Sequence, residues 1–223
     1  MKKVLVAIIV SVMVLSLGLL AAGQTGSGSL DSELLEAAYR GDTAAVQQLL
    51  RNGANLEAKD KYGHTVLTTA AYKGNVEVVR LLLEKGANIE AKEVAGHTAL
   101  IAAASLDRGE VVKLLLEKGA NTEVKDDGGQ TALTIAAYGG NLQAVKLLLE
   151  KGANIESQDE KGHTALLWAA YRGRAEVAKL LLEKGANIEA KDKYGNTALT
   201  LAEIAKSNSK RKVIHLLLKN GAK

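Results

Sequence analysis

The chain of 223 residues has no cysteine, no proline and no phenylalanine, and it has a single tryptophan. Without cysteine it has no disulfide framework, no thiol nucleophile and no zinc site built on thiolates. Aromatic residues make up 3% of the sequence, whereas hydrophobic residues make up 47%. We therefore expect a core of Leu, Val, Ile and Ala in closely packed helices, without a large aromatic nucleus.

The chain also lacks a strong excess of either charge. Its 29 Lys and Arg against 25 Asp and Glu give a formal net charge of +4, and two of the lysines, Lys2 and Lys3, belong to the N-terminal segment discussed below. A nucleic-acid-binding protein usually gathers a marked basic excess on one face, whereas here Glu and Lys are interleaved. We therefore expect no nucleic-acid partner.

Repetition is what the sequence has in abundance. The segment LLLEKGANIEAK at residues 81–92 recurs with small changes at Leu114, Leu147 and Leu180, thirty-three residues apart each time. A period of this length indicates a solenoid, whose units bury their apolar faces only against neighbouring units.

The N-terminus has the layout of a secretory signal. Two lysines precede the apolar run 4–22, and small residues end that run before Gln24. We expect residues 1–23 to be a cleaved signal peptide of bacterial type and residues 24–28 to be a flexible linker. The alternative is an uncleaved membrane anchor, because a bilayer-spanning helix needs ~20 apolar residues. In both cases the repeats are exported, to the periplasm or outside the cell.

One unit, residues 60–92, shows the pattern of turn, cap and helix-end residues that all units share. Gly63 suits a turn with positive φ. Thr65 is expected to cap a first, alanine-rich helix, and Asn75 to cap a second one. Gly86 can end the second helix in the left-handed conformation. Each unit is therefore expected to contain two helices joined by a tight turn.

The spacing G-x-T-x-L-x-x-A-A, then L-L, then G-A-N, runs in phase through five consecutive units and resembles that of ankyrin repeats. The resemblance covers residues 29–223. It implies an all-α solenoid of about six stacked helix-turn-helix units, with β-hairpin loops projecting from one edge and a concave face that binds other proteins. The expected units are an N-terminal capping repeat at 29–59, repeats at 60–92, 93–125, 126–158 and 159–191, and a C-terminal capping repeat at 192–223.

The units depart from the family's T-P-L-H motif, which reads Thr65-Val66-Leu67-Thr68 in the second unit. Proline at the first helical position adds stiffness without being essential. The missing histidine removes a Thr–His hydrogen bond that the family usually makes. We therefore expect somewhat weaker individual units.

Binding residues are expected where the units differ, at the ends of the first helices and at the hairpin tips. All six tyrosines lie in these two places, and Tyr and Arg are residue types that anchor interfaces. The alternative is that the helix-end tyrosines only shield the inner turn of each unit. The candidate partner-binding residues are Tyr39, Arg40, Tyr62, Tyr72, Lys73, Leu106, Tyr138, Tyr171, Arg172 and Tyr194.

Two positions break the pattern of the first helices. The unit 93–125 has Ser105 and Leu106 where other units have tyrosine, and its glycine is displaced to Gly109. We expect Leu106 to be an apolar contact in the middle of the concave face, with a shifted helix end that buries it as the rival. Trp168 is expected to pack between units rather than to be a binding hot spot.

The sequence gives little support for a metal-binding or catalytic function. His64, His97 and His163 share one repeat position, but neighbouring units lie ~8–10 Å apart, whereas two imidazoles on one zinc must each come within ~2.1 Å of it. No catalytic motif stands out, so we expect neither an enzyme nor a cofactor or metal. The basic run 210–212 is interpreted as the solvated face of the last unit rather than a patch for nucleic acid or lipid.

The leading hypothesis is an exported, monomeric module that holds an envelope or secreted partner protein on its concave face. One alternative is a membrane-anchored scaffold or spacer, which would contact the membrane only through residues 4–22. Another is a secreted effector that binds a host protein.

Overall fold

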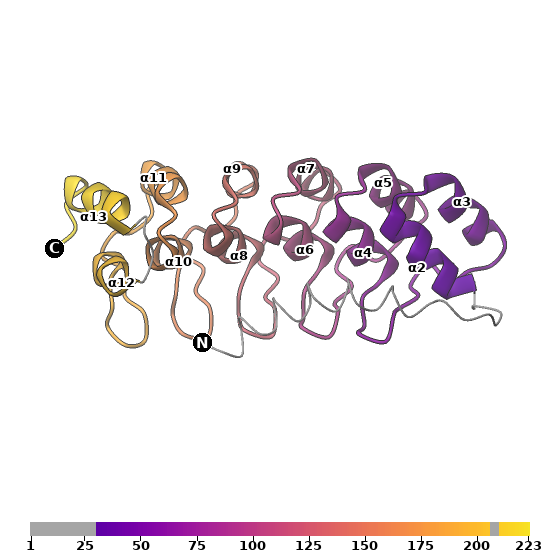
Figure 1. Ribbon diagram of the computed structural model, residues 1–223, viewed down its shortest axis with the longest axis horizontal. Coiled ribbons are helices and arrows are strands. Elements are labelled where there is room, and N and C mark those ends of the chain that lie inside the picture. The colour runs from indigo at the N-terminus through magenta and orange to yellow at the C-terminus, as the bar shows by residue number, and fades with distance from the viewer. Residues whose placement is uncertain (1–29, 206–209) are drawn as a thin grey trace.

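The computed structural model describes residues 30–205 and 210–223. Within them, twelve helices follow one another in pairs (Figure 1). The first helices of the pairs are α2 (Leu30–Arg40), α4 (Val66–Lys73), α6 (Ala99–Ser105), α8 (Ala132–Gly139), α10 (Ala165–Arg172) and α12 (Ala198–Ile204). The second helices are α3 (Thr43–Arg51), α5 (Val76–Glu84), α7 (Gly109–Glu117), α9 (Leu142–Glu150), α11 (Ala175–Glu183) and α13 (Lys210–Lys219).

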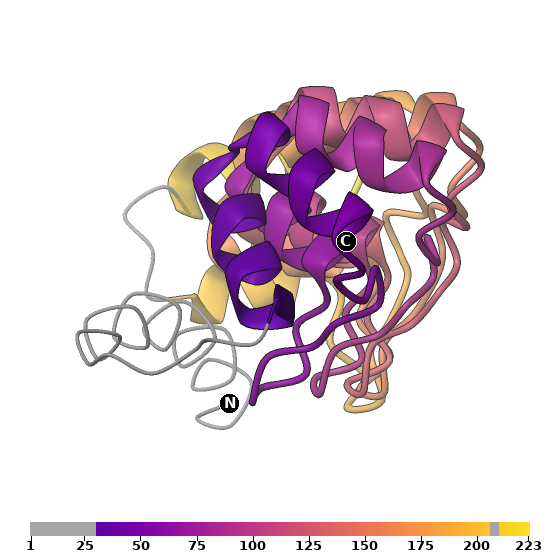
Figure 2. The ribbon, with the colours of Figure 1, turned by 90° about the vertical axis from the view of Figure 1, so that its right-hand side faces the viewer.

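The pairs stack side by side into an elongated array, with the first helices in one row and the second helices in another (Figure 1). Viewed along the array, the loops between pairs project from the helices on one side (Figure 2). We call the surface formed by the first helices and these loops the inner face. The predicted all-α solenoid is confirmed, and among the described residues the loops contribute one isolated antiparallel bridge, Lys59–Thr65, rather than named strands.

The first helices begin at a threonine, as predicted. The Thr65 Oγ1 accepts a hydrogen bond from the Thr68 backbone N–H at 3.0 Å, and the Thr68 Oγ1 accepts one from the Thr65 N–H at 2.8 Å. This reciprocal cap occupies the position of the family's histidine, so a Thr–Thr hydrogen bond takes the place of the missing Thr–His bond, and the expected weakness of the units stays a prediction. The same cap forms between Thr131 and Thr134 and between Thr197 and Thr200.

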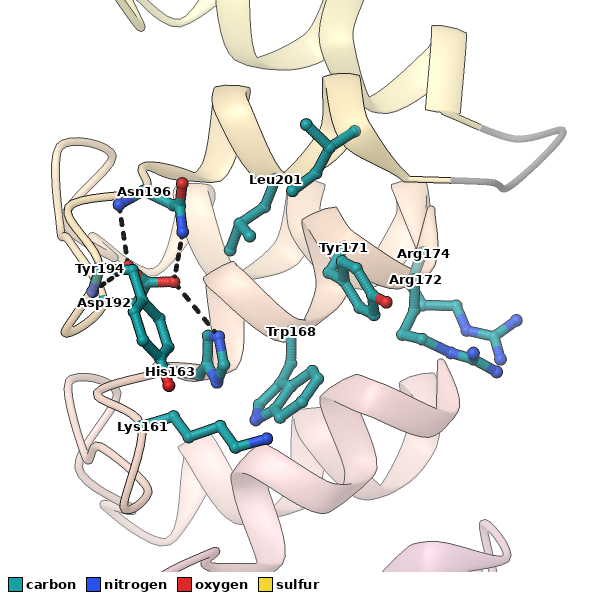
Figure 3. A pocket seen from close by; sticks show the side chains of 11 residues that line it. Lys161, His163, Trp168, Tyr171, Arg172, Arg174, Asp192, Tyr194, Asn196 and Leu201 are labelled. Atoms are coloured by element: carbon teal, nitrogen blue, oxygen red, sulfur yellow. Dashed lines mark hydrogen bonds and ion pairs between the residues drawn. The ribbon is translucent and has the colours of Figure 1, made fainter. Parts of the chain in front are cut away.

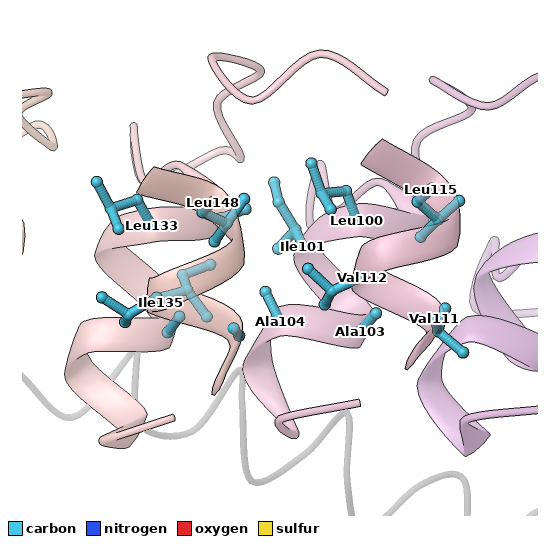
Figure 4. Close-up of a cluster of buried hydrophobic side chains, with 14 of the residues drawn as sticks. Leu100, Ile101, Ala103, Ala104, Val111, Val112, Leu115, Leu133, Ile135 and Leu148 are labelled. Carbon is cyan, nitrogen blue, oxygen red and sulfur yellow. The ribbon is translucent and has the colours of Figure 1, made fainter. Parts of the chain in front are cut away.

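The core is aliphatic and continuous along the array. In its middle, Leu100 and Ile101 of α6 lie with Leu115 of α7 and with Leu148 of α9 (Figure 4), and all four are at most 1% exposed. Alanines such as Ala103, which is fully buried, let neighbouring first helices approach closely. Because each pair contributes side chains to the same core, no pair is stable as a separate domain.

The start of the second helices differs from the prediction. Asn75 makes no side-chain cap bond to its own helix. Its Nδ2 instead donates to the carbonyl oxygens of Ala38 at 2.7 Å and Tyr39 at 3.1 Å in the preceding pair. Arg108, one unit later, donates from Nε to the Tyr72 oxygen at 3.1 Å. This position therefore supplies donors to carbonyls at the C-terminal end of the preceding first helix, where the hydrogen bonds within the helix end.

The end of α6 explains the displaced glycine. Asp107 has φ of 53°, in the left-handed region that Gly74 occupies in the preceding pair. Asp is among the few residues other than Gly that tolerate this region, and the Asp107 Oδ1 accepts a hydrogen bond from the Ala144 N–H at 2.9 Å. Leu106, just before it, is half-buried, which lies between the two predicted environments.

The repeated segment that reveals the array also holds it together. Glu57, Glu90 and Glu123 each accept a hydrogen bond from a backbone N–H of the next unit, at 2.7 to 2.9 Å. Lys59 and Lys92 each donate to a backbone carbonyl thirty-three residues further on. These contacts recur with the period of the sequence, which explains why the segment is nearly identical from unit to unit.

Several predictions concern the two ends. The expected signal peptide, anchor and linker, at residues 1–28, lie outside the described residues. Within the described part, no helix combines the length and apolar character needed to cross a membrane. At the N-terminal end of the array, Leu34 and Ala38 of α2 are buried while Ser32 and Glu33 are exposed, as expected of a capping repeat. In the basic run, Lys210 is half-buried and Arg211 and Lys212 are exposed, which fits either a solvated face or a charged patch, so the interpretation stays a prediction.

Candidate functional site

The predicted residues of the first units gather on the inner face. The Nζ of Lys73, at the end of α4, lies 3.8 Å from the ring centroid of Tyr39 and 5.7 Å from that of Tyr72. Burial raises the pKa of Tyr72, and the Arg108 charge opposes this effect. Tyr39 and Tyr72 are both half-buried, so each ring contributes to packing and keeps part of its surface on the inner face.

A second aromatic group forms on the inner face around Trp168. Its ring lies 5.0 Å from that of Tyr138 in an edge-to-face arrangement, 6.0 Å from that of Tyr171 and 4.4 Å from the His163 ring. Arg172 covers the Tyr138 ring, with Cζ 4.5 Å from the centroid. Trp168 is only 9% exposed and contacts Tyr138 of the preceding unit, so it packs between units as predicted, and it also lines the groove described below.

The remaining predicted residues are more dispersed. Tyr62 lies in a hairpin loop, half-buried, with its ring 5.9 Å from the His64 ring. Tyr194, at the same position of the last unit, is 75% exposed. Arg40 forms an ion pair with Glu36 of its own helix. Tyr62 and Arg40 therefore lie apart from the two aromatic groups, whereas Tyr194 lines the groove beside the second group. Whether any of them binds a partner remains a prediction.

The second aromatic group forms one wall of a groove with a volume of about 870 Å3. In Figure 3, Trp168 lies in the middle, the hairpin residues Lys161 and Tyr194 lie on one side, and Arg172 lies on the other. The groove combines a deep aromatic wall, an exposed tyrosine and cationic side chains. Such a combination suits an interface anchor, because it offers large contact area together with hydrogen-bond donors.

The three histidines of the hairpin loops bridge neighbouring units. His97 lies between Glu93 of its own unit, with Nδ1 2.9 Å from Oε1, and Asp126 of the next unit, with Nε2 3.4 Å from Oδ2. His64 reaches the same Glu93 with Nε2 at 3.1 Å, and it also contacts Asp60 at 2.7 Å. The result is a row of alternating carboxylates and imidazoles along the loops.

The row has a clear electrostatic signature at His97. Burial alone would lower the pKa of His97, but hydrogen bonds to Asp126 and Glu93 and the charges of these carboxylates raise it to about 9. Where residue 130 is Gln the row is interrupted, and it resumes with His163 between Asp159 and Asp192. Within the described residues no group of three or more His, Asp or Glu is arranged to hold a metal ion.

Two features of the groove were not predicted from the sequence. The Arg174 Nε donates to the Tyr138 carbonyl at 3.2 Å, and the Trp168 Nε1 donates to Asp159 Oδ2 at 3.1 Å. Arg174 occupies the repeat position of Asn75, and that shared position was the only signal in the sequence. Neither contact could be predicted from sequence spacing. The Tyr138 carbonyl belongs to the preceding unit, and Asp159 lies in the loop that precedes the helix of Trp168.

A comparison with known families agrees with this architecture. A family model described as ankyrin repeats (3 copies) matches residues 34–126, 110–192 and 133–223. These matches together span nearly the whole described chain, so the protein belongs to the ankyrin repeat family. Such repeats generally mediate protein–protein interaction and are typically not catalytic. No curated protein matches the chain.

Proposed function

We propose that the protein is an exported, monomeric binding module of about six repeats that holds an envelope or secreted partner protein on its inner face. The observation that carries this proposal is that Trp168, Tyr171 and Arg172 line one groove, with Tyr138 packed against Trp168 and Arg172. Aromatic and arginine side chains in partly desolvated pockets supply most of the binding energy in many interfaces. Export is supported by the signal-like layout of the first residues.

The binding role is tested by capturing partners in the source cells with the full chain carrying a C-terminal tag. Replacing Tyr72 and Tyr138 together by Ala should remove most of the captured partner, because both rings are lost from the inner face. Leu142→Ala is the matched control. Leu142 is an apolar residue, 41% exposed, on α9, which is one of the second helices and does not form the inner face. Equal capture by the double variant, folded as judged by circular dichroism, would exclude this site.

A membrane-anchored scaffold is the second candidate function, favoured by the length of the apolar run 4–22. Mass spectrometry of the N-terminus of the protein recovered from cells separates the two. A chain that begins near Gln24 supports a released module. An intact N-terminus in the membrane fraction supports the anchored scaffold instead.

A further inference from the structure

The groove around Trp168 carries uncompensated positive charge. Three cationic side chains line it, from Lys161, Arg172 and Arg174, and Asp192 is the one carboxylate among its lining residues. The Asp192 carboxylate is already saturated, because it accepts hydrogen bonds from the backbone N–H of Tyr194 at 2.9 Å and from both the backbone and the side chain of residue 196 at 2.8 and 2.9 Å. Its Oδ2 also lies 3.4 Å from His163 Nε2, so both oxygens already have partners and the groove keeps an excess of cationic side chains.

The two arginines have no carboxylate partner of their own. Among the described residues, arginine ion pairs form at Arg40 and Arg80 only. The Arg172 Nε is buried and makes no hydrogen bond. Burial and the like charge of Arg172 lower the pKa of Arg174. The Arg172 guanidinium lies on the Tyr138 ring and has no carboxylate beside it, so an anion at this end of the groove would be stabilised by charge-assisted hydrogen bonds.

The groove also has an apolar part, formed by Trp168, Leu201 and Ile204. Trp168 and Leu201, at 9% and 4% exposed, form its floor, and Ile204, at 63% exposed, extends the apolar surface to the rim. The volume of about 870 Å3 falls in the ~300–1,000 Å3 range of sites that enclose a drug-sized group. It can therefore hold a few side chains of an extended segment.

We propose that this groove binds an acidic segment of the partner protein, with a carboxylate on Arg172 and Arg174 and an aromatic or long aliphatic side chain against Trp168 and Leu201. The inference rests on the proposed function and adds the chemistry of the partner. Charge complementarity selects this occupant: carboxylates form charge-assisted, bidentate hydrogen bonds with guanidinium groups.

A nucleic acid fits the same surface less well. A phosphate backbone is bound along a continuous basic track with exposed rings for base stacking. In the unit next to the groove the first helix ends at Gly139, and Asp127 and Glu160 are exposed at the hairpin tips. Trp168 is too buried to stack on a base. The cationic region is therefore local, as an acidic peptide segment requires.

The test uses a displayed library of random twelve-residue peptides, selected on the purified full chain. Enriched sequences should be rich in Asp and Glu around an aromatic or long aliphatic residue. Synthetic versions should bind roughly tenfold or more weakly to Arg172→Gln, because this variant loses a charge-assisted contact. The control Lys179→Gln removes the same charge from the exposed side of the outer helix α11 and should bind normally. All variants are compared by circular dichroism and thermal unfolding.

Occupancy of the groove has its own reporter, since Trp168 is the only tryptophan in the chain. Binding of an enriched acidic peptide should change its fluorescence, and added salt should weaken binding. Neutral or basic enriched sequences, unchanged binding to Arg172→Gln, or tighter binding of oligothymidylate than of any enriched peptide would each overturn the inference. Failure of the selection to enrich any sequence over the Arg172→Gln chain would overturn it too. If Arg172→Gln still captures the cellular partner while the Tyr72 and Tyr138 variant does not, the proposed function stands and only this inference fails.

Discussion

Replacing His97 by Gln should remove a pH-dependent part of the stability of the array. His97 bridges Glu93 and Asp126 of adjacent units at 2.9 and 3.4 Å, and its side chain is only 16% exposed. The rise of its pKa from 6.5 to about 9 corresponds to about 3 kcal/mol, at 1.36 kcal/mol for each pH unit. Gln is a suitable replacement because Gln130 occupies the same position in the next unit, where it is 5% exposed.

The sign of the effect follows from proton linkage. The folded state binds the His97 proton more tightly than the unfolded state, so the stabilisation is fully present below about pH 6.5 and is lost as the pH rises through about 9. The wild-type chain should therefore lose up to about 3 kcal/mol over this range, whereas His97→Gln should lose little of it. His64, which shares Glu93, remains in both proteins.

Two assays check this prediction. Urea denaturation at several pH values gives the stability difference between the wild-type chain and His97→Gln. NMR titration of the His97 ring protons gives its pKa directly. The matched control His215→Gln changes an exposed histidine on α13 and should follow the wild-type pH profile. A titration midpoint of His97 near 6.5, or identical pH profiles for His97→Gln and the wild-type chain, would refute the reasoning.

Three further substitutions test the contacts that build the array, each by urea denaturation. Thr68→Val keeps the shape of a buried side chain but removes the acceptor of the Thr65 N–H, so it should cost about 1–2 kcal/mol; no loss would contradict the reciprocal cap. Asn75→Ala removes two hydrogen bonds to the preceding unit and should cost about 1–3 kcal/mol of the free energy of unfolding. Asn75→Arg should lose less, because Arg108 makes the equivalent hydrogen bond one unit later. An equal loss in both variants would argue against the interunit role. Leu148→Ala, in the core at 0% exposed, should cost about 2–5 kcal/mol, and a loss below 1 kcal/mol would mean that the core is looser than described.

The parts of the fold that depend on local spacing could be predicted from the sequence. Thr65 precedes an alanine-rich helix at capping distance, and Gly63 and Gly86 adopt the positive φ expected of them. Each of these assignments concerns residues within a few positions of one another. The thirty-three-residue period then places every other unit by translation, which is why the solenoid itself was predictable.

The contacts between units could not be predicted in the same way. Asn75 has the sequence context of an N-cap, but its side-chain amide bonds to a carbonyl of the preceding unit instead of to its own helix. The sequence spacing within one unit does not show how close that carbonyl lies. His97 was found as a repeated position, but its carboxylate partners follow from the stacking of the loops. The groove likewise depends on Trp168 and Arg174 reaching another unit.

In the proposed function the partner binds to the inner face and not to the exposed side of the second helices. The most direct measurement places a photo-crosslinking amino acid at Lys161, on the groove, or at Lys179, on the exposed side of α11, in the full chain produced in the source cells. One discrete crosslinked protein is expected from position 161 and none from position 179. Crosslinking from position 179 alone, or equally from both positions, would contradict it.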